Sequence, residues 1–191
     1  MAWVAEILRK EHRICAQCRL APTHVYDPDP AEGDDAFGEI GQEPSGTPLC
    51  TACLPPRLIE DFTSFTARGL LFEPALGPEA IVFHPLDGPE ATAWPEERQD
   101  LVKARLDSLK ERCDSCELPG RFLWVPVESD ANLWPDDCLA ALERGDLAPT
   151  ETLCGSCAAG RLARSIEERG LFYEAIVPPR GGDGVMFGSE I

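Results

Sequence analysis

Eight of the nine cysteines form four Cys-x-x-Cys pairs, and their thiols are the side chains in this sequence best suited to chemistry. Two residues between paired cysteines allow both thiolates to reach one ion from a single turn. Four thiolates with no histidine at ligand spacing make a closed tetrahedral shell, which is typical of structural rather than catalytic zinc. The predicted metal ligands are Cys15, Cys18, Cys50, Cys53, Cys113, Cys116, Cys154 and Cys157.

The four pairs belong to a duplicated segment. Residues 153–174 repeat residues 49–73: both begin Leu-Cys-x-x-Cys, continue in a helical pattern and end Arg-Gly-Leu-(Leu/Phe)-(Phe/Tyr)-Glu. A further pair lies upstream of each, separated from the next pair by 31 residues in the first copy and by 37 in the second. An internal repeat of this kind predicts two copies of one structural unit. We therefore expect two zinc ions per chain, each held by the two pairs of one copy, with ligands shared between copies as the alternative.

Other uses of the paired thiols fit the sequence less well. Iron is an alternative metal, because four thiolates also bind it in rubredoxin-like sites. Disulfides and dithiol redox exchange are a further alternative, but a redox pair usually accompanies a βαβ pattern, which the sequence lacks. Nine cysteines without a visible export signal indicate a reducing cytoplasm, where paired thiols are more often metal ligands. The unpaired Cys138 is expected to be a buried apolar residue.

The chain is strongly acidic, with 34 Asp and Glu against 17 Lys and Arg and a formal net charge of −17. Such a field repels nucleic acid and anionic membranes and attracts a basic partner. Seven acids and no base lie in residues 27–43, which we interpret as a solvated loop, with a partner-binding acidic arm as the alternative. No apolar run approaches the length needed to cross a membrane. We therefore expect a cytoplasmic protein that binds a basic protein.

Catalytic motifs are missing from the sequence. The three histidines, His12, His24 and His84, have none of the spacings of zinc deaminases or HExxH proteases, and there is no Gly-rich phosphate loop. We therefore do not expect an enzyme. Nucleic-acid binding is the alternative function, because the helical segments after the second pair of each copy carry several arginines. These are Arg57, Arg68, Arg161, Arg164 and Arg169.

Periodicity predicts the same order of elements in each copy. A helix precedes the first cysteine pair, a strand follows that pair, and a second helix follows the other pair and ends at a glycine, Gly69 or Gly170. The second-copy helix is expected to be three residues shorter, since Cys157 and Gly170 are 13 positions apart and Cys53 and Gly69 are 16 apart. The other predicted elements are helices at 2–13, 95–111 and 135–144, and strands at 23–26, 70–72, 81–83, 122–127, 171–173 and 185–187.

These elements predict an α+β fold made of two tandem zinc-binding units. The first unit covers residues 1–86, the linker 87–94 and the second unit 95–191, with an inserted helix at 135–144. Strands of about three residues are too short to be stable alone, so each must pair with its own hairpin partner or with the other unit. We expect one pseudo-symmetric body in which an approximate two-fold axis relates the units.

The order of CxxC turn, hairpin and CxxC helix resembles the treble-clef and zinc-ribbon group of four-cysteine zinc fingers, over residues 15–73 and 113–174. The paired motifs are also faintly similar to bacterial double-CxxCG immunity proteins. Glycine often follows the second cysteine of such a turn, where this chain has Arg19 and Glu117, so we expect distorted turns there. The resemblance implies a treble-clef-like unit present twice, in a bacterial regulator, antitoxin or immunity-type protein that docks on another protein.

Overall fold

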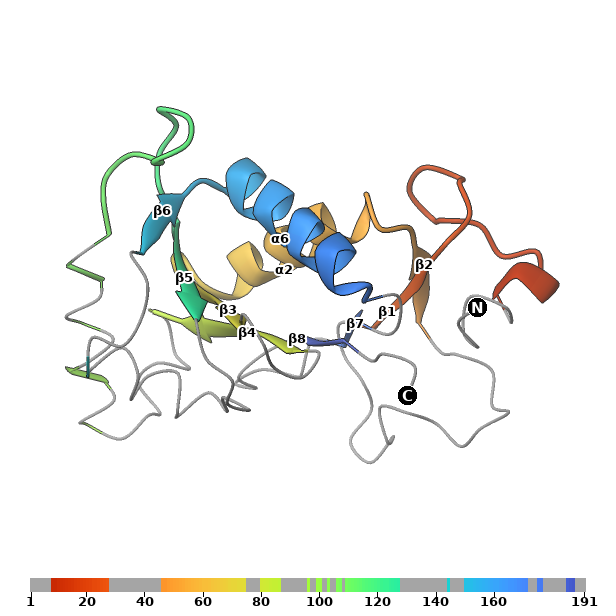
Figure 1. Ribbon diagram of the computed structural model, residues 1–191, viewed down its shortest axis with the longest axis horizontal. Helices are drawn as coiled ribbons and strands as arrows, with labels where there is room; N and C mark the ends of the chain where they lie inside the picture. Colours follow the sequence, from red (N-terminus) through yellow and green to blue (C-terminus); the bar gives the residue numbers. More distant parts are fainter. Residues whose placement is uncertain are drawn as a thin grey trace.

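A computed structural model of the chain contains both helices and strands, which confirms the predicted α+β class (Figure 1). In chain order the elements are β1 (His24–Asp27), β2 (Thr47–Leu49), α2 (Leu54–Phe65), β3 (Gly69–Pro74), β4 (Ala80–Pro85), β5 (Phe122–Val127), β6 (Glu151–Leu153), α6 (Gly155–Arg169), β7 (Ala175–Ile176) and β8 (Val185–Phe187). The structure describes residues 8–27, 46–74, 80–86, 96, 99–100, 103, 106–107, 109–127, 144, 150–171, 175–176 and 185–187. Within these ranges no helix has the length and apolar character that membrane crossing requires.

The strands of these ranges form one eight-stranded sheet in the order β2-β1-β7-β8-β4-β3-β5-β6. By their order in the chain and their pairing, β1 to β4 of the first copy correspond to β5 to β8 of the second. If each strand in this order is replaced by its counterpart from the other copy, the result is the same order read from the opposite edge of the sheet. The strand order therefore has two-fold symmetry, with its centre between β4 and β8.

The last hairpin of each copy pairs with the first strand of the other copy: β3–β4 lies beside β5, and β7–β8 lies beside β1. β3 pairs antiparallel with β4, as the sequence predicts, and parallel with β5 of the second copy. In the equivalent place, β7 pairs parallel with β1 of the first copy and antiparallel with β8. β4 and β8 pair antiparallel at the centre. The two copies therefore share one sheet.

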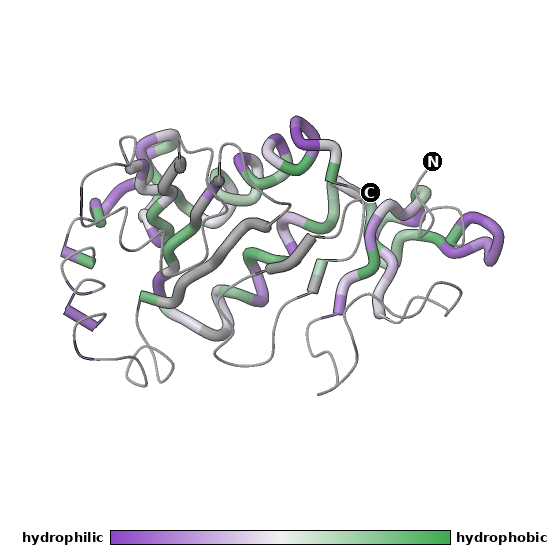
Figure 2. Tube along the Cα trace, turned by 60° about the horizontal axis from the view of Figure 1, so that its bottom comes forward, coloured by the Kyte–Doolittle hydropathy of each residue, from purple (hydrophilic) through white to green (hydrophobic). Residues whose placement is uncertain are grey.

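Helices α2 and α6 lie next to each other over the sheet (Figure 1). Pro55 and Pro56 stand in the first turn of α2, where a missing N–H costs no helical hydrogen bond. Leu58 of α2 and Leu162 of α6 are buried in a core that also contains cysteines of both copies. Figure 2 shows hydrophobic and hydrophilic positions alternating along the helical turns, as expected for helices with one buried face.

The ends of these helices correct two sequence predictions. The residue after α2, Thr66, is extended, so Gly69 is not the helix cap. Gly69 instead begins β3, where a Cβ atom would lie 1.9 Å from Phe62 Cε1. In the second copy, Gly170 does cap the helix in a left-handed conformation, with a φ of 66°. Helix α6 has 15 residues and α2 has 12, so the second-copy helix is the longer one, because the first copy leaves its helix before the repeated Arg-Gly.

Two short strands were missed by the sequence analysis. β2 and β6 each contain three residues, and each directly precedes a cysteine pair. They form the two edges of the sheet. Segments this short carry too few positions for an alternating pattern to be visible in the sequence.

Several other predicted boundaries can be compared only in part. Residues 8–10 are helical within the predicted helix 2–13, whereas 109–110 of the predicted helix 95–111 are no longer helical. Of the predicted strand 171–173, only Leu171 is described, and it lies outside the strands. The unit boundaries remain predictions. The linker 87–94, loop residues 28–43, Cys138 and most of the predicted helix 135–144 lie outside the described residues.

His24 connects the two copies inside the core. Its side chain is fully buried in β1, where Nε2 donates to the carbonyl of Leu171 at 3.2 Å and Nδ1 accepts from Thr23 Oγ1 at 2.8 Å. Burial lowers the pKa of His24 to about 4, although the bond to the Leu171 carbonyl favours the protonated ring. The folded chain therefore holds the neutral imidazole.

Replacing His24 by Phe, the residue at the equivalent position 122, should weaken the pH dependence of stability. Below an unfolded-state pKa of about 6.5, the unfolded chain binds a proton that the folded chain does not, so wild-type stability falls as the pH drops towards about 4. Between about pH 7.5 and about pH 5.5, the wild type should lose about 1.4 kcal/mol more than the variant. Urea unfolding of the zinc-loaded proteins measures this difference, and equal losses would contradict a neutral buried His24.

Candidate metal centres

The structure gathers the paired cysteines into two clusters of four sulfur atoms. All sulfurs of one cluster lie within 4.8 Å of one another. Each cluster combines the two pairs of one copy, and neither cluster includes a histidine or a ligand of the other copy among the residues described. The eight paired cysteines are free thiols rather than disulfides. The clusters are Cys15, Cys18, Cys50 and Cys53, and Cys113, Cys116, Cys154 and Cys157.

The sulfur positions suit a tetrahedral ion. The sulfurs of Cys18 and Cys50 are 3.5 Å apart, and Cys116 Sγ lies 3.5 Å from Cys154 Sγ and 3.4 Å from Cys157 Sγ. Zn–S bonds of about 2.3 Å would place the sulfurs of a tetrahedral site about 3.8 Å apart. Each cluster could therefore hold a metal ion such as zinc, with thiolates in all four coordination positions.

A turn before a strand and a helix start assemble each cluster. Cys154 is the N-cap residue of α6, and its sulfur accepts the backbone N–H of Cys157 at 3.5 Å. In the turn before β5, the backbone N–H of Ser115 donates to Cys113 Sγ at 3.4 Å. Backbone N–H groups and the positive end of the helix dipole stabilise thiolate charge at these positions.

The backbone hydrogen bonds around one cluster are repeated around the other. The N–H of Cys15 donates to the carbonyl of Leu20 at 2.8 Å, and the N–H of Cys113 donates to the carbonyl of Leu118 at the same distance of 2.8 Å. Further bonds join each turn to the adjacent edge strand. They run from Ala16 to Pro48, from Thr23 to Leu49, from Asp114 to Thr152 and from Arg121 to Leu153. The sequence repeat is therefore also a repeat of local structure.

Arg19 and Glu117 have positive φ angles of 66° and 20°, at the positions where glycine is common in zinc-binding turns. The turns thus form without glycine, although their geometry differs between the copies at this residue. A left-handed conformation costs an L residue about 1–2 kcal/mol.

Arg19→Gly and Glu117→Gly should each stabilise the folded protein by about 0.5–1 kcal/mol. Glycine removes the left-handed penalty but adds backbone entropy to the unfolded chain, which offsets part of the gain. Gln17→Gly is the matched control, since Gln17 is exposed in the same turn and has no positive φ. It should be destabilising, and a similar loss from Arg19→Gly in urea unfolding would contradict the strained turn.

The thiols of a cluster differ in acidity. Burial opposes ionisation of Cys15, but backbone N–H groups, first that of Cys18, lower its pKa to about 6. Burial likewise opposes ionisation of Cys113, but backbone N–H groups, first that of Cys154, lower its pKa to about 7. Burial and the neighbouring thiols raise the pKa of Cys53. One thiolate therefore discourages ionisation of the others, and a divalent cation among them would remove this repulsion.

A polar contact between the copies was missed by the sequence analysis. Glu73 of β3 accepts the indole Nε1–H of Trp124 at 3.0 Å and the hydroxyl of Ser165 at 2.6 Å. Trp124 and Ser165 are both buried and belong to the second copy. The sequence feature that could have pointed to this contact is the repeated motif, whose last residue in the first copy is Glu73.

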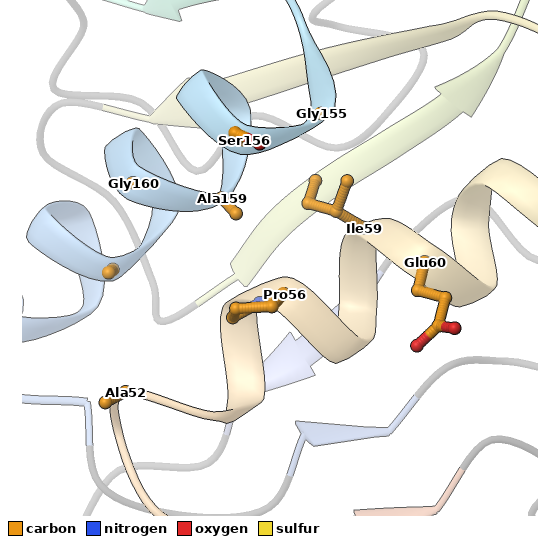
Figure 3. Close-up of a pocket in the computed structure, with 9 residues that line it drawn as sticks. Ala52, Pro56, Ile59, Glu60, Gly155, Ser156, Ala159 and Gly160 are labelled. Atoms are coloured by element: carbon orange, nitrogen blue, oxygen red, sulfur yellow. The ribbon is translucent and has the colours of Figure 1, made fainter.

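The two helices leave an open groove of about 480 Å³ where they meet (Figure 3). Ile59 of α2 points toward α6, and a Cβ atom at Gly155 would lie 3.5 Å from Ile59 Cγ2. Most of the lining consists of small or apolar residues, including Ala159 and Gly160. The groove therefore reflects close helix packing and offers no cluster of reactive groups.

No protein-family model, curated protein or solved structure matches this chain.

Proposed function

We propose that this chain is an acidic, zinc-stabilised module that binds a basic protein. Each copy would be a treble-clef-like unit, and the whole would act as a bacterial regulator, antitoxin or immunity-type protein. The carrying observation is the pair of four-thiolate clusters, which leave a bound zinc no open position for substrate and so favour a structural role. The net charge of −17 favours a basic partner.

Two features of the surface support docking. Leu20 and Leu118, at equivalent positions of the two turns, expose 65% and 55% of their surface. The turns lie at opposite edges of the shared sheet (Figure 1). An exposed apolar residue near each edge can contact a partner protein.

The contacts of two arginines weaken the nucleic-acid alternative. Arg57 Nε lies 3.1 Å from a carboxylate oxygen of Asp61, and Arg161 is paired with Glu151. Phosphate recognition would have to compete with these ion pairs and with the overall negative charge.

Affinity capture with the zinc-loaded chain as bait, followed by mass spectrometry of the eluate from source cells, tests this proposal. We expect a basic protein that is released by increased salt, because charged surfaces attract less at high ionic strength. Recovery of RNA or DNA that stays bound to the chain during washing, without a basic protein, would overturn it.

A further inference from the structure

The turns that carry the first cysteine pair of each copy differ in the side-chain bonds that hold them to the sheet. Both turns share one backbone bond with the adjacent edge strand. The N–H of Ala16 donates to the carbonyl of Pro48 at 2.9 Å, and the N–H of Asp114 donates to the carbonyl of Thr152 at 2.8 Å. Ala16 and Pro48 are therefore the counterparts of Asp114 and Thr152, and the two turns can be compared residue by residue.

In the second copy, the carboxylate of Asp114 adds a bond in the opposite direction. Its Oδ2 accepts the backbone N–H of the buried Thr152 at 2.8 Å, and its Oδ1 accepts from Lys110 Nζ at 2.6 Å. Hydrogen bonds to a carboxylate are stronger than those between neutral groups. An ion pair of 2.7 Å between Arg112 and Glu117 also spans this turn, but it is exposed and contributes little. Asp114 is therefore the main side-chain contact between this turn and β6.

The first copy lacks the groups that form these bonds. Ala16 has no carboxylate, and Pro48 has no backbone N–H that a carboxylate could accept. Ile14 and Arg19, at the positions of the ion pair, do not carry opposite charges. The first turn is therefore attached to β2 without the carboxylate bridge of the second copy.

The metal-ligating thiols of the two turns also differ in exposure. Cys18 is exposed, whereas Cys116 at the equivalent position is half-buried. The other thiols of the two turns, Cys15 and Cys113, are buried. The first centre is therefore the one that a ligand from solution can approach, and it approaches on the side of Cys18.

We infer that the two metal centres differ in lability. The first centre exchanges its metal ion while the chain stays folded, whereas the second centre keeps its ion. When the turn of residues 15–20 opens from β2, Cys18 gives up its coordination position to an incoming thiolate. One metal–sulfur bond forms as another breaks, so the step needs no oxidant or reductant. The inference rests on the zinc-binding part of the proposed function and not on the basic partner.

Replacement of zinc by cadmium tests this difference. Cd²⁺ is a softer ion than Zn²⁺ and replaces it at thiolate ligands. When Cd²⁺ is added to the chain loaded with two zinc ions, the amide shifts of residues 15–20 and 113–118 report on the two centres separately. We expect the first centre to exchange at least about tenfold faster, because the turn opens without breaking a bond to a carboxylate. Equal rates, or faster exchange at the second centre, would overturn the inference.

Asp114→Ala gives the second turn the residue of the first and should speed exchange at the second centre about tenfold. Exchange at the first centre should stay unchanged. Ser115→Ala is the matched control, because Ser115 is exposed in the same turn and keeps its backbone bond to Cys113; both rates should stay unchanged. Preserved dispersion of the amide spectrum shows that each variant is folded.

Two outcomes separate this inference from the proposed function. If Asp114→Ala leaves exchange at the second centre unchanged in a chain that holds two zinc ions, the inference is wrong and the zinc-stabilised module stands. If elemental analysis finds no metal in the wild type, both are wrong.

Discussion

Replacing Cys157 by Ser should unfold the whole chain, and not only the copy that contains the substitution. Zinc binding supplies about 10–16 kcal/mol of apparent free energy in small structural sites, which matches or exceeds the stability of a typical domain. The copies also depend on each other, because β3 is paired with β5 and β7 with β1. Cys53→Ser at the equivalent position should have the same effect.

Circular dichroism, amide spectra and elemental analysis together measure this result. The wild type should contain two zinc ions per chain. Ser156→Ala is the control, since Ser156 is exposed between Cys154 and Cys157 and offers no ligand at this spacing; it should change stability by less than about 0.5 kcal/mol. A Cys157→Ser protein that keeps one zinc and half of its dispersed signals would show that the copies fold independently. A wild type with four disulfides and no metal would refute the paired centres.

Replacing Trp124 by Ala should reduce the free energy of unfolding by about 3–5 kcal/mol. The indole is 1% exposed, lies in β5 beside β3 and donates to Glu73 of the first copy at 3.0 Å. Its removal would leave a cavity in the core and take one donor from the half-buried carboxylate of Glu73.

Trp124→Phe separates these two contributions. Phenylalanine keeps most of the packing and loses the N–H donor, so it should cost about 1.5–3 kcal/mol, the range for a hydrogen bond to a charged group. Urea unfolding of both variants gives the comparison. Equal costs for Ala and Phe would contradict the view that packing of the ring dominates.

Spacing along the chain was enough to predict which cysteines meet. A Cys-x-x-Cys turn brings two sulfurs together locally, and the repeat indicates which pairs belong to one cluster. The helix α6 and its glycine cap at Gly170 were visible for the same reason, since helical periodicity and caps depend on neighbouring residues. The acidic charge and the missing catalytic motifs likewise needed no coordinates.

Contacts between distant residues could not be read in this way. The cap predicted at Gly69 was wrong because the ring of Phe62 fills the space beside that residue, and glycine is needed for this approach rather than for a helix end. The bond from His24 to the Leu171 carbonyl joins residues 147 positions apart. A pattern among neighbouring residues does not indicate a contact between residues so far apart in the sequence.

The exchange of hairpins between the copies is the main feature that the folded chain adds. A strand of two to six residues can satisfy its backbone hydrogen bonds with several partners, so its sequence pattern does not predict which strand it pairs with. The choice depends on which arrangement buries both helices and satisfies both sides of every inner strand. Pairing of β3 with β5 and of β7 with β1 meets these demands for the two copies together, and residues far apart in sequence, such as Glu73 and Trp124, thereby become neighbours.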